Sequence, residues 1–563
     1  MSVSSMPALM ADVTIEWSDY EPRYQELLQR DLTPETATQY LQDWSDLTAE
    51  IIEKSTILGV RADLNTAEKS IQDKYLTFVK ETNPKISSAD AAVKARLVAL
   101  EGYAPPEDAV LILKRFKTES QIFREENLPL FAELAELSQQ YSQITGNMLV
   151  DFRGEQITAP RVEQLLLEPD RELREEVWKA WQDARLRIAP QLDEVFMKQL
   201  ALRQQVARNA GFQNHQEFIW KMYHRYDYTP ADARQFQQSI EQEVVPFALE
   251  LLEQHRQGLG VDSLKPWDFY WRSQMDPLAR APLNPFKTVD ELETKIQKVF
   301  ASLSPELGEQ FELFRQEGSM DLGSRKNKMS HAYCASLPTR KLPFVLQNVV
   351  GMEGDVTVTL HEFGHAFHGY SSMKQNRFVW NGFSATEFVE VPSQGMECLA
   401  IPHLGAFYTP EEIQRVKEAQ ILRVVHILPW IAFMDSFQDW VYTQAPEDVT
   451  IEQIDAKCRE LINRLQPQPS WEGFEAQQGK AWHYHHIFTS PFYYIEYGLS
   501  WLGALQLWRN SLQDPAGALE KYQASLALGD TRSVPELYEA AGLKFAFDRE
   551  TIRDLMGFLR EQM

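Results

Sequence analysis

The sequence predicts a mainly α-helical protein folded into two or more lobes, and three observations support this prediction. The chain has 563 residues, more than twice the length that a single hydrophobic core usually supports. Hydrophobic residues make up 44% of it and aromatic residues 11%, enough for large buried cores and against long disordered stretches. Apolar residues recur at helical spacing through most of the chain.

The segment at residues 129–144 illustrates the helical pattern. Its apolar residues recur at alternating intervals of four and three positions, with polar residues between them: Leu130, Leu134, Leu137, Tyr141 and Ile144. Such spacing places an apolar stripe on one face of a helix. Pro129, just ahead of the stripe, is typical of a helix start. Residues on such stripes belong to the core, and we assign none of them a function.

Residues 333–349 depart from the helical pattern. β-forming residues stand on both sides of a loop bounded by Pro338 and Pro343, and they predict two short strands, 333–337 and 344–349. These strands lie immediately upstream of the histidine-rich motif described below.

The net charge and the number of cysteines limit which partners and which cellular compartment we expect. The net charge of −25 argues against a nucleic-acid partner, which needs an excess of basic residues. Three scattered cysteines are too few for a disulfide framework and indicate a reducing compartment: Cys334, Cys398 and Cys458. Without a secretory signal or a stretch long enough to span a bilayer, we expect a soluble cytoplasmic protein with no membrane partner.

Residues 360–368 read LHEFGHAFH, which places three histidines and a glutamate in one short stretch. We expect a helix here, with Asp355 as its N-cap and Gly369 as its stop. On a helix His361 and His365 lie one turn apart, about 6 Å along the axis, so both rings reach one ion. Glu362 lies beside them and can take a proton from water. This pattern is typical of a zinc hydrolase.

The alternative interpretation is a histidine-rich helix without a metal. A metzincin site is excluded, because His368 and Ser371 stand where that motif requires Gly and His. We interpret His368 as a structural residue, since it is one ligand too many for a tetrahedral site. The third ligand must therefore come from another segment.

Three carboxylates follow in SATEFVEVPSQGMECLAIP, namely Glu387, Glu390 and Glu397. Two histidines and one glutamate form a known catalytic zinc set. Glu390 and Glu397 share a face if this segment is helical, so one could bind the metal while the other orients a ligand histidine. Spacing does not choose among the three.

A second cluster lies at residues 482–501, in WHYHHIFTSPFYYIEYGLSW. It contains several possible hydrogen-bond donors: His483, Tyr484, His485, His486, Tyr493, Tyr494 and Tyr497. Such groups suit the stabilisation of an oxyanion formed from a peptide carbonyl. The alternative is an aromatic core helix with exposed histidines at its start.

Three motifs together resemble a known family: HEFGHAFH, FVEVPSQGME and HIFTSPFYYIEY. They are similar to the zinc oligopeptidases related to thimet oligopeptidase, especially the oligoendopeptidase F branch. The resemblance covers most of residues 150–563. It implies His361, His365 and Glu390 as ligands of one zinc ion and Glu362 as general base.

The same resemblance implies that His486, Tyr494 and Tyr497 face the substrate carbonyl. The stretch SPFYYIEY replaces the glycine-rich loop of the thimet branch, so Tyr493 is an alternative to Tyr494. The family fold has two helical lobes around a deep channel, with a small sheet beside the zinc helix. We expect residues 1–195 to form a helical N-terminal region and residues 196–563 the catalytic region.

The expected function is therefore zinc-dependent cleavage of internal bonds in short unfolded peptides. An exopeptidase that grips a free carboxylate through Arg340, Lys341 or Arg377 is the alternative within enzymes. An inactive peptide-binding protein is the alternative outside them. Because peptidases commonly hold an extended substrate as an added strand, we expect strand 333–337 or strand 344–349 to line the channel.

Overall fold

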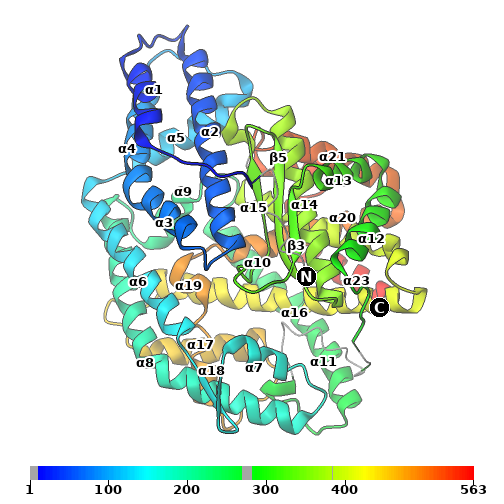
Figure 1. Cartoon of the computed structure of the whole chain (residues 1–563). Coiled ribbons are helices and arrows are strands. Elements are labelled where there is room, and N and C mark those ends of the chain that lie inside the picture. The colour runs from blue at the N-terminus through cyan, green and yellow to red at the C-terminus, as the bar shows by residue number, and fades with distance from the viewer. Residues whose placement is uncertain (1–9, 269–279, 281, 383–384) are drawn as a thin grey trace. The chain divides into compact units, whose positions relative to one another are not determined.

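Most of the chain is helical, as the apolar periodicity predicts (Figure 1). The computed structural model describes residues 10–268, 280, 282–382 and 385–563. The helix expected from the stripe at residues 129–144 is α6, Leu128–Gly146, with Pro129 in its first turn. The prediction of a mainly α fold with a small β-sheet is confirmed.

Two compact units divide the chain, and each is assembled from three separate segments. The first unit contains Met1–Gln121, Pro282–Gln414 and Gly503–Phe545, and the second contains Ile122–Ala281, Arg415–Leu502 and Ala546–Met563. Helices α16, Pro410–Thr443, and α20, Ile495–Gln513, each contain several residues of both units. The predicted boundary between residues 195 and 196 stays a prediction, and it falls inside α8, Arg171–Asn209.

The first unit holds an N-terminal helical layer and the three-stranded sheet. Its helices are α1 Trp17–Gln29, α2 Ala37–Leu64, α3 Lys69–Thr77, α4 Asn83–Val98, α5 Val110–Ile122, α12 Val289–Leu303, α13 Pro305–Gln316, α14 Glu353–Gln375, α15 Thr386–Leu399, α21 Pro515–Leu528 and α22 Val534–Ala540. The N-terminal helices share an aromatic core that includes Tyr24, Tyr40 and Trp44.

The second unit is helical apart from one hairpin. Its remaining helices are α7 Ala159–Leu165, α9 His215–Met222, α10 Pro230–Glu243, α11 Val245–Leu259, α17 Ile451–Leu465, α18 Glu475–Gly479, α19 His485–Thr489 and α23 Arg549–Gln562. Strands β1, Val150–Phe152, and β2, Glu155–Ile157, pair antiparallel. Arg153 and Gly154 between them both have positive φ, which suits a tight two-residue turn.

The three-stranded sheet positions the histidine-rich helix. The predicted strands are β4, Tyr333–Leu337, and β5, Leu342–Val349, and they pair antiparallel. A third strand, β3 at Met320–Gly323, runs parallel to β5, so the order is β3-β5-β4. Gln347 of β5 donates to the Asp355 carbonyl of α14 at 2.9 Å and accepts from the Thr359 hydroxyl at 2.8 Å.

Both predicted ends of the histidine-rich helix are wrong. The helix begins at Glu353 with Met352 as N-cap, so Asp355 lies inside the first turn. Its carboxylate there accepts the backbone N–H groups of residues 350, 351 and 352 at 2.7–2.9 Å. Gly369 does not stop the helix, which continues to Gln375 because the residues that follow, such as Tyr370 and Met373, are also buried.

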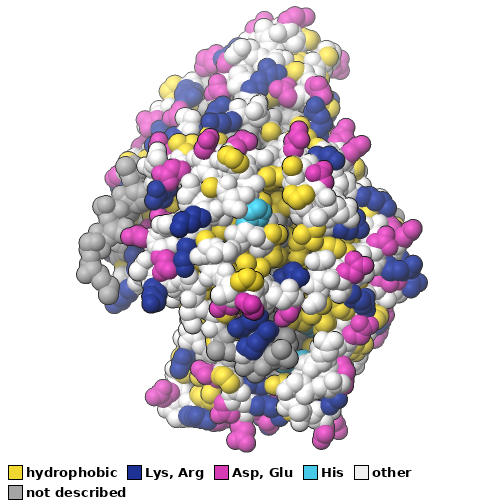
Figure 2. All heavy atoms as spheres, turned by 90° about the vertical axis from the view of Figure 1, so that its right-hand side faces the viewer, with side chains coloured by type: hydrophobic (Ala, Val, Ile, Leu, Met, Phe, Trp, Pro, Cys, Tyr) yellow, Lys and Arg dark blue, Asp and Glu magenta, His cyan; other side chains and the backbone are white. Residues whose placement is uncertain are grey.

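Charged side chains are spread over the surface. Figure 2 shows acidic and basic side chains interspersed with hydrophobic ones on one face, so the acidic excess is not gathered there into one patch. Within the described residues, every helix is too short or too polar to cross a lipid bilayer.

Candidate metal centre

Helix α14 places its aromatic residues on one face and two histidines on another. Phe363 and Phe367 pack against Phe300 of α12, with ring centroids 5.9 and 4.9 Å apart. These contacts fix the rotation of the helix, because a helix buries its apolar stripe. His361 and His365 consequently lie side by side and remain partly exposed, with ring centroids 4.9 Å apart.

Helix α15 crosses α14 at Gly364. A Cβ atom at Gly364 would lie 2.6 Å from the Pro392 carbonyl oxygen and from the Ser393 Cα, closer than such atoms can approach. The glycine therefore permits the backbones of the two helices to touch. This close crossing brings the Glu390 side chain of α15 to the two histidines of α14.

The three predicted ligand side chains converge. The Glu390 Oε2 atom lies 3.3 Å from the Nε2 atom of His361 and 3.3 Å from that of His365. Donor atoms of all three residues lie within 4.8 Å of one another, the compact spacing that a single ion requires. Two imidazoles and a carboxylate are a donor set that suits zinc and leaves a coordination position open.

The other two candidate carboxylates have different contacts. Glu397 accepts a hydrogen bond from the outer nitrogen of His361, with Nδ1 and Oε1 2.7 Å apart. The Glu387 carboxylate is buried and contacts the Thr386 hydroxyl at 3.2 Å. Glu390 and Glu397 thus share a helix face, as the sequence predicts, and each contacts a different nitrogen of the same imidazole.

Ser393 was not identified from the sequence. Its hydroxyl donates to the Glu390 carboxylate at 2.8 Å and lies 3.0 Å from the Glu390 carbonyl. The only sequence signal is its place three residues after Glu390 on the same helix, a spacing that brings side chains together. The contact restrains the carboxylate in the direction of the histidines.

The electrostatics of the cluster favour positive charge at its centre. Burial opposes protonation of His361, but hydrogen bonds to Glu390 and Glu397 outweigh it and raise its pKa to about 10. Glu390 is buried too, yet the two histidines hold its pKa well below the usual range. A cation is the species that such a group of acceptors stabilises, so the residues fit a bound metal ion.

Glu362 and His368 lie on the same helix in buried positions. Burial raises the pKa of the Glu362 carboxyl, which strengthens it as a base. Burial lowers the pKa of His368 to about 3, and its ring packs against Phe388 with centroids 6.1 Å apart. His368 is not among the converging donors, which agrees with a structural role.

Strand β4 lies against the same helix. A Cβ atom at Gly369 of α14 would lie 3.4 Å from the Ser336 Oγ atom of β4. Cys334 is partly exposed, and the pKa of its thiol is raised, first by desolvation and then by the charge of Glu362. Among the described residues, β5 is paired on both sides and β4 on one, so β4 is the strand of this pair with one unpaired edge there.

The predicted histidine and tyrosines also lie together, in the second unit. The His486 ring is 4.8 Å from that of Tyr494 and 5.9 Å from that of Tyr497, between centroids. The hydroxyls of Tyr484 and Tyr494 are 3.4 Å apart. Tyr494 is buried, whereas Tyr493 and Tyr497 are partly exposed. The residues occupy α19, the turn after it and the start of α20, so the single aromatic helix considered above is wrong.

Several solved structures are similar to this chain over almost its whole length. A structure of PZ peptidase A with an inhibitor is 22% identical, with a TM-score of 0.87, and the alignment covers 99% of this chain and 100% of that one. A putative oligoendopeptidase F is 24% identical, with a TM-score of 0.85 and coverage of 99% and 98%. A putative oligoendopeptidase F from Bacillus anthracis str. Ames is 20% identical, with a TM-score of 0.83 and coverage of 99% and 98%.

These similarities show the fold. No curated protein matches the chain significantly. The model of peptidase family M3 matches residues 164–557, which include both clusters. The chain therefore belongs to peptidase family M3 and is a metallopeptidase.

Proposed function

We propose that this metallopeptidase is a zinc-dependent oligoendopeptidase, which hydrolyses internal bonds of short unfolded peptides. The observation that supports it is the convergence of His361, His365 and Glu390 within 4.8 Å. We assign these three residues as the ligands of one zinc ion. A zinc ion supplies Lewis-acid polarisation and makes water acidic enough to react at neutral pH.

Glu362 is assigned as the general base. Its carboxylate takes a proton from the attacking water and later gives it to the amine of the leaving peptide. Its raised pKa makes it a stronger proton acceptor than an exposed glutamate. His486, Tyr494 and Tyr497 are assigned, from the family resemblance, as donors to the oxyanion of the substrate carbonyl.

Strand β4 is the proposed binding edge for the substrate backbone. An extended peptide that pairs with it gains main-chain hydrogen bonds with little side-chain selectivity. Sheet order supports Tyr333–Leu337 over the alternative at 344–349, since β5 is central. Proximity to Glu362 of α14 supports it further.

Substitution of the general base tests the mechanism. The Glu362→Gln variant keeps the shape of the side chain but cannot accept a proton, so we expect turnover to fall by about 100-fold or more. Zinc content and folding should equal those of the unmodified protein. A quenched-fluorescent peptide assay with metal analysis measures both, and cleavage at the unmodified rate would exclude this mechanism.

A capped peptide distinguishes the alternative of an exopeptidase. Arg377 pairs with Asp108 through two contacts of 2.7 and 2.9 Å, and Arg340 lies 3.4 Å from Glu53. Both arginines are thus engaged with acidic side chains, which weakens their case as grips for a free carboxylate. An endopeptidase should still cut a peptide whose C-terminus is an amide, and it should cut between internal residues.

A further inference from the structure

Two buried arginines bind the backbone of the segment that carries the histidine–tyrosine cluster. Arg203 of α8 donates to the carbonyl oxygens of Ile487 at 2.9 Å and Phe488 at 2.6 Å. It also donates to the Tyr442 hydroxyl at 2.7 Å. The C-terminal end of α19 is thereby fixed directly after His486.

Arg225 binds the next turn of the same segment. Its guanidinium donates to the Phe492 carbonyl at 2.6 Å and to the Glu496 carboxylate at 2.8 Å. The side chains of Arg225 and Glu496 are both 0% exposed. The Trp220 ring stacks on the guanidinium, 4.3 Å away at its centroid, and the Tyr228 hydroxyl donates to Glu496 at 3.2 Å.

Phe492 is held in an uncommon backbone conformation by these contacts. Its φ is +63°, a left-handed conformation that is unfavourable for a residue with a side chain. Its N–H donates to the Gln438 side chain at 2.7 Å, while its carbonyl is bound by Arg225. The peptide groups on both sides of Phe492 are therefore fixed, and so is the direction in which the chain enters Tyr493 and Tyr494.

The buried ion pair is better explained by geometry than by stability. Removing two charges from water offsets most of their attraction, so such pairs add little net stability. A bidentate guanidinium nevertheless defines the relative position of its partners closely. Here the partners are the carbonyl that precedes Tyr493 and the carboxylate that precedes Tyr497.

We propose that Arg225 is a positioning residue, which sets the placement of Tyr494 and Tyr497 through Phe492 and Glu496. The inference rests on the proposed role of these tyrosines as donors to the substrate carbonyl. The Arg225 side chain is 0% exposed, so we expect it to act through the tyrosines and not through contact with the substrate. Its loss should therefore alter turnover through the tyrosines, and leave the metal ligands of the first unit unaffected.

The Arg225→Lys variant tests this inference. Lysine retains the charge but cannot span the carbonyl and the carboxylate as a planar fork, so the turn at residues 492–496 loosens. We expect kcat to fall by about 10- to 100-fold with KM and zinc content nearly unchanged. Hydrogen exchange measured by mass spectrometry should show faster exchange of the amides at residues 484–497.

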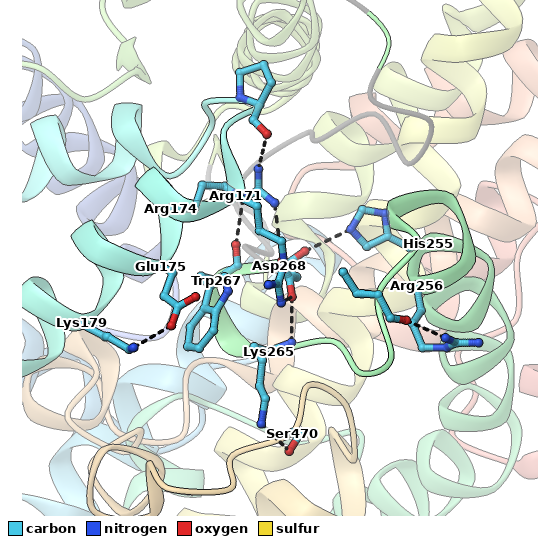
Figure 3. Close-up of polar contacts among 12 residues, drawn as sticks. Arg171, Arg174, Glu175, Lys179, His255, Arg256, Lys265, Trp267, Asp268 and Ser470 are labelled. Carbon is cyan, nitrogen blue, oxygen red and sulfur yellow. Dashed lines mark hydrogen bonds and ion pairs between the residues drawn. The ribbon is translucent and has the colours of Figure 1, made fainter.

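A matched buried arginine provides the control. Arg174 is also buried and binds a buried acid, Asp268, and the carbonyl of Trp267 (Figure 3). It also donates to the carbonyls of Glu168 and Pro169. It holds a different part of the second unit. The Arg174→Lys variant should lose about as much stability as Arg225→Lys. Its kcat and the hydrogen exchange of the amides at residues 484–497 should equal those of the unmodified protein.

The outcomes separate this inference from the proposed function. Unmodified kcat in a folded Arg225→Lys protein, or a lower kcat with unchanged exchange at residues 484–497, would overturn it. If Arg225→Lys does not fold, Gln438→Met removes the acceptor for the Phe492 N–H without disturbing a charge. The inference then requires this variant to show both a lower kcat and faster amide exchange at residues 484–497. If Tyr497→Phe leaves kcat unchanged, the proposed role of the tyrosine fails, while the exchange data still show whether Arg225 fixes the segment.

Discussion

His361 contacts two carboxylates, one at each ring nitrogen. Glu390 lies on the inner side, 3.3 Å from Nε2, and Glu397 on the outer side, 2.7 Å from Nδ1. An outer carboxylate keeps the proton on Nδ1, orients the ring and makes the inner nitrogen a stronger ligand. The affinity of the proposed zinc site therefore depends on a residue that does not touch the ion.

We expect the Glu397→Gln variant to bind zinc about 10- to 100-fold more weakly, because the amide no longer supplies a negative charge to His361. Zinc affinity is measured by competition with a chromogenic chelator. Asp193→Asn is the matched control, since Asp193 contacts His483 at 2.8 Å within the second unit, whereas the proposed ligands belong to the first. Equal affinities of Glu397→Gln and the unmodified protein would show that Glu397 does not support His361.

At the scale of elements, the crossing of α14 and α15 sets the geometry of the candidate metal centre. Gly364 allows this crossing because the atoms that an added Cβ would meet are backbone atoms of residues 392 and 393, which cannot move independently. Any larger residue must separate the helices. Glu390 would then move away from His361 and His365.

We expect Gly364→Ala to destabilise the protein by about 1–3 kcal/mol and to lose zinc. Gly557 is a suitable control, because it lies within α23 and an added Cβ there meets nothing within 4 Å. Gly557→Ala should stabilise by about 0.5–1 kcal/mol. Urea unfolding and metal analysis provide both readouts, and a Gly364→Ala protein with full zinc content would contradict the crossing argument.

Elements with a local signal could be predicted from the sequence, and those that depend on distant partners could not. The stripe beginning at Leu130 and the strands flanking Pro338 are local patterns, and both elements are present. Strand β3 has four residues and exists through its pairing with β5, so it has no such signal. The helix start was misplaced because Asp355 is an equally good acceptor one turn later.

In the candidate site, too, local spacing could be predicted from the sequence, whereas contacts between distant residues could not. Spacing placed His361 and His365 on one face, and the resemblance selected Glu390, whose contacts with both histidines agree with that choice. Spacing alone left Glu387, Glu390 and Glu397 equivalent, because their distances to His361 depend on the helix crossing. The Arg225–Glu496 pair joins residues 271 positions apart, a separation over which one sequence gives no signal.

At the scale of the whole molecule, two histidines whose pKa is lowered in the folded state make stability depend on pH. Burial lowers the pKa of His426 and of His483 from 6.5 to about 4, although Asp193 partly opposes this at His483. Above pH 6.5 each histidine is neutral in both the folded and the unfolded protein, and its contribution to the free energy of unfolding is fully present. As the pH falls from 6.5 to about 4, the unfolded chain binds protons first, and each histidine removes about 3 kcal/mol of stability.

We expect the free energy of unfolding to decrease between about pH 7 and about pH 4.5, and His426→Gln to make this decrease shallower by about 3 kcal/mol. Glutamine does not titrate, so its contribution is constant over this range. Urea titrations at several pH values measure the difference between the two proteins. Parallel curves for both proteins would show that His426 does not titrate differently in the folded state.

The interleaved arrangement of the chain affects biosynthesis. Each unit takes one of its three segments from the end of the sequence, Gly503–Phe545 for the first and Ala546–Met563 for the second. A ribosome that has translated the first 500 or so residues has therefore completed neither core. Domains built from continuous sequence fold as they emerge, whereas here the nascent chain exposes apolar surface until residues 503–563 have been made. Such a chain depends on chaperones for longer, and neither unit can be expressed alone as one continuous fragment.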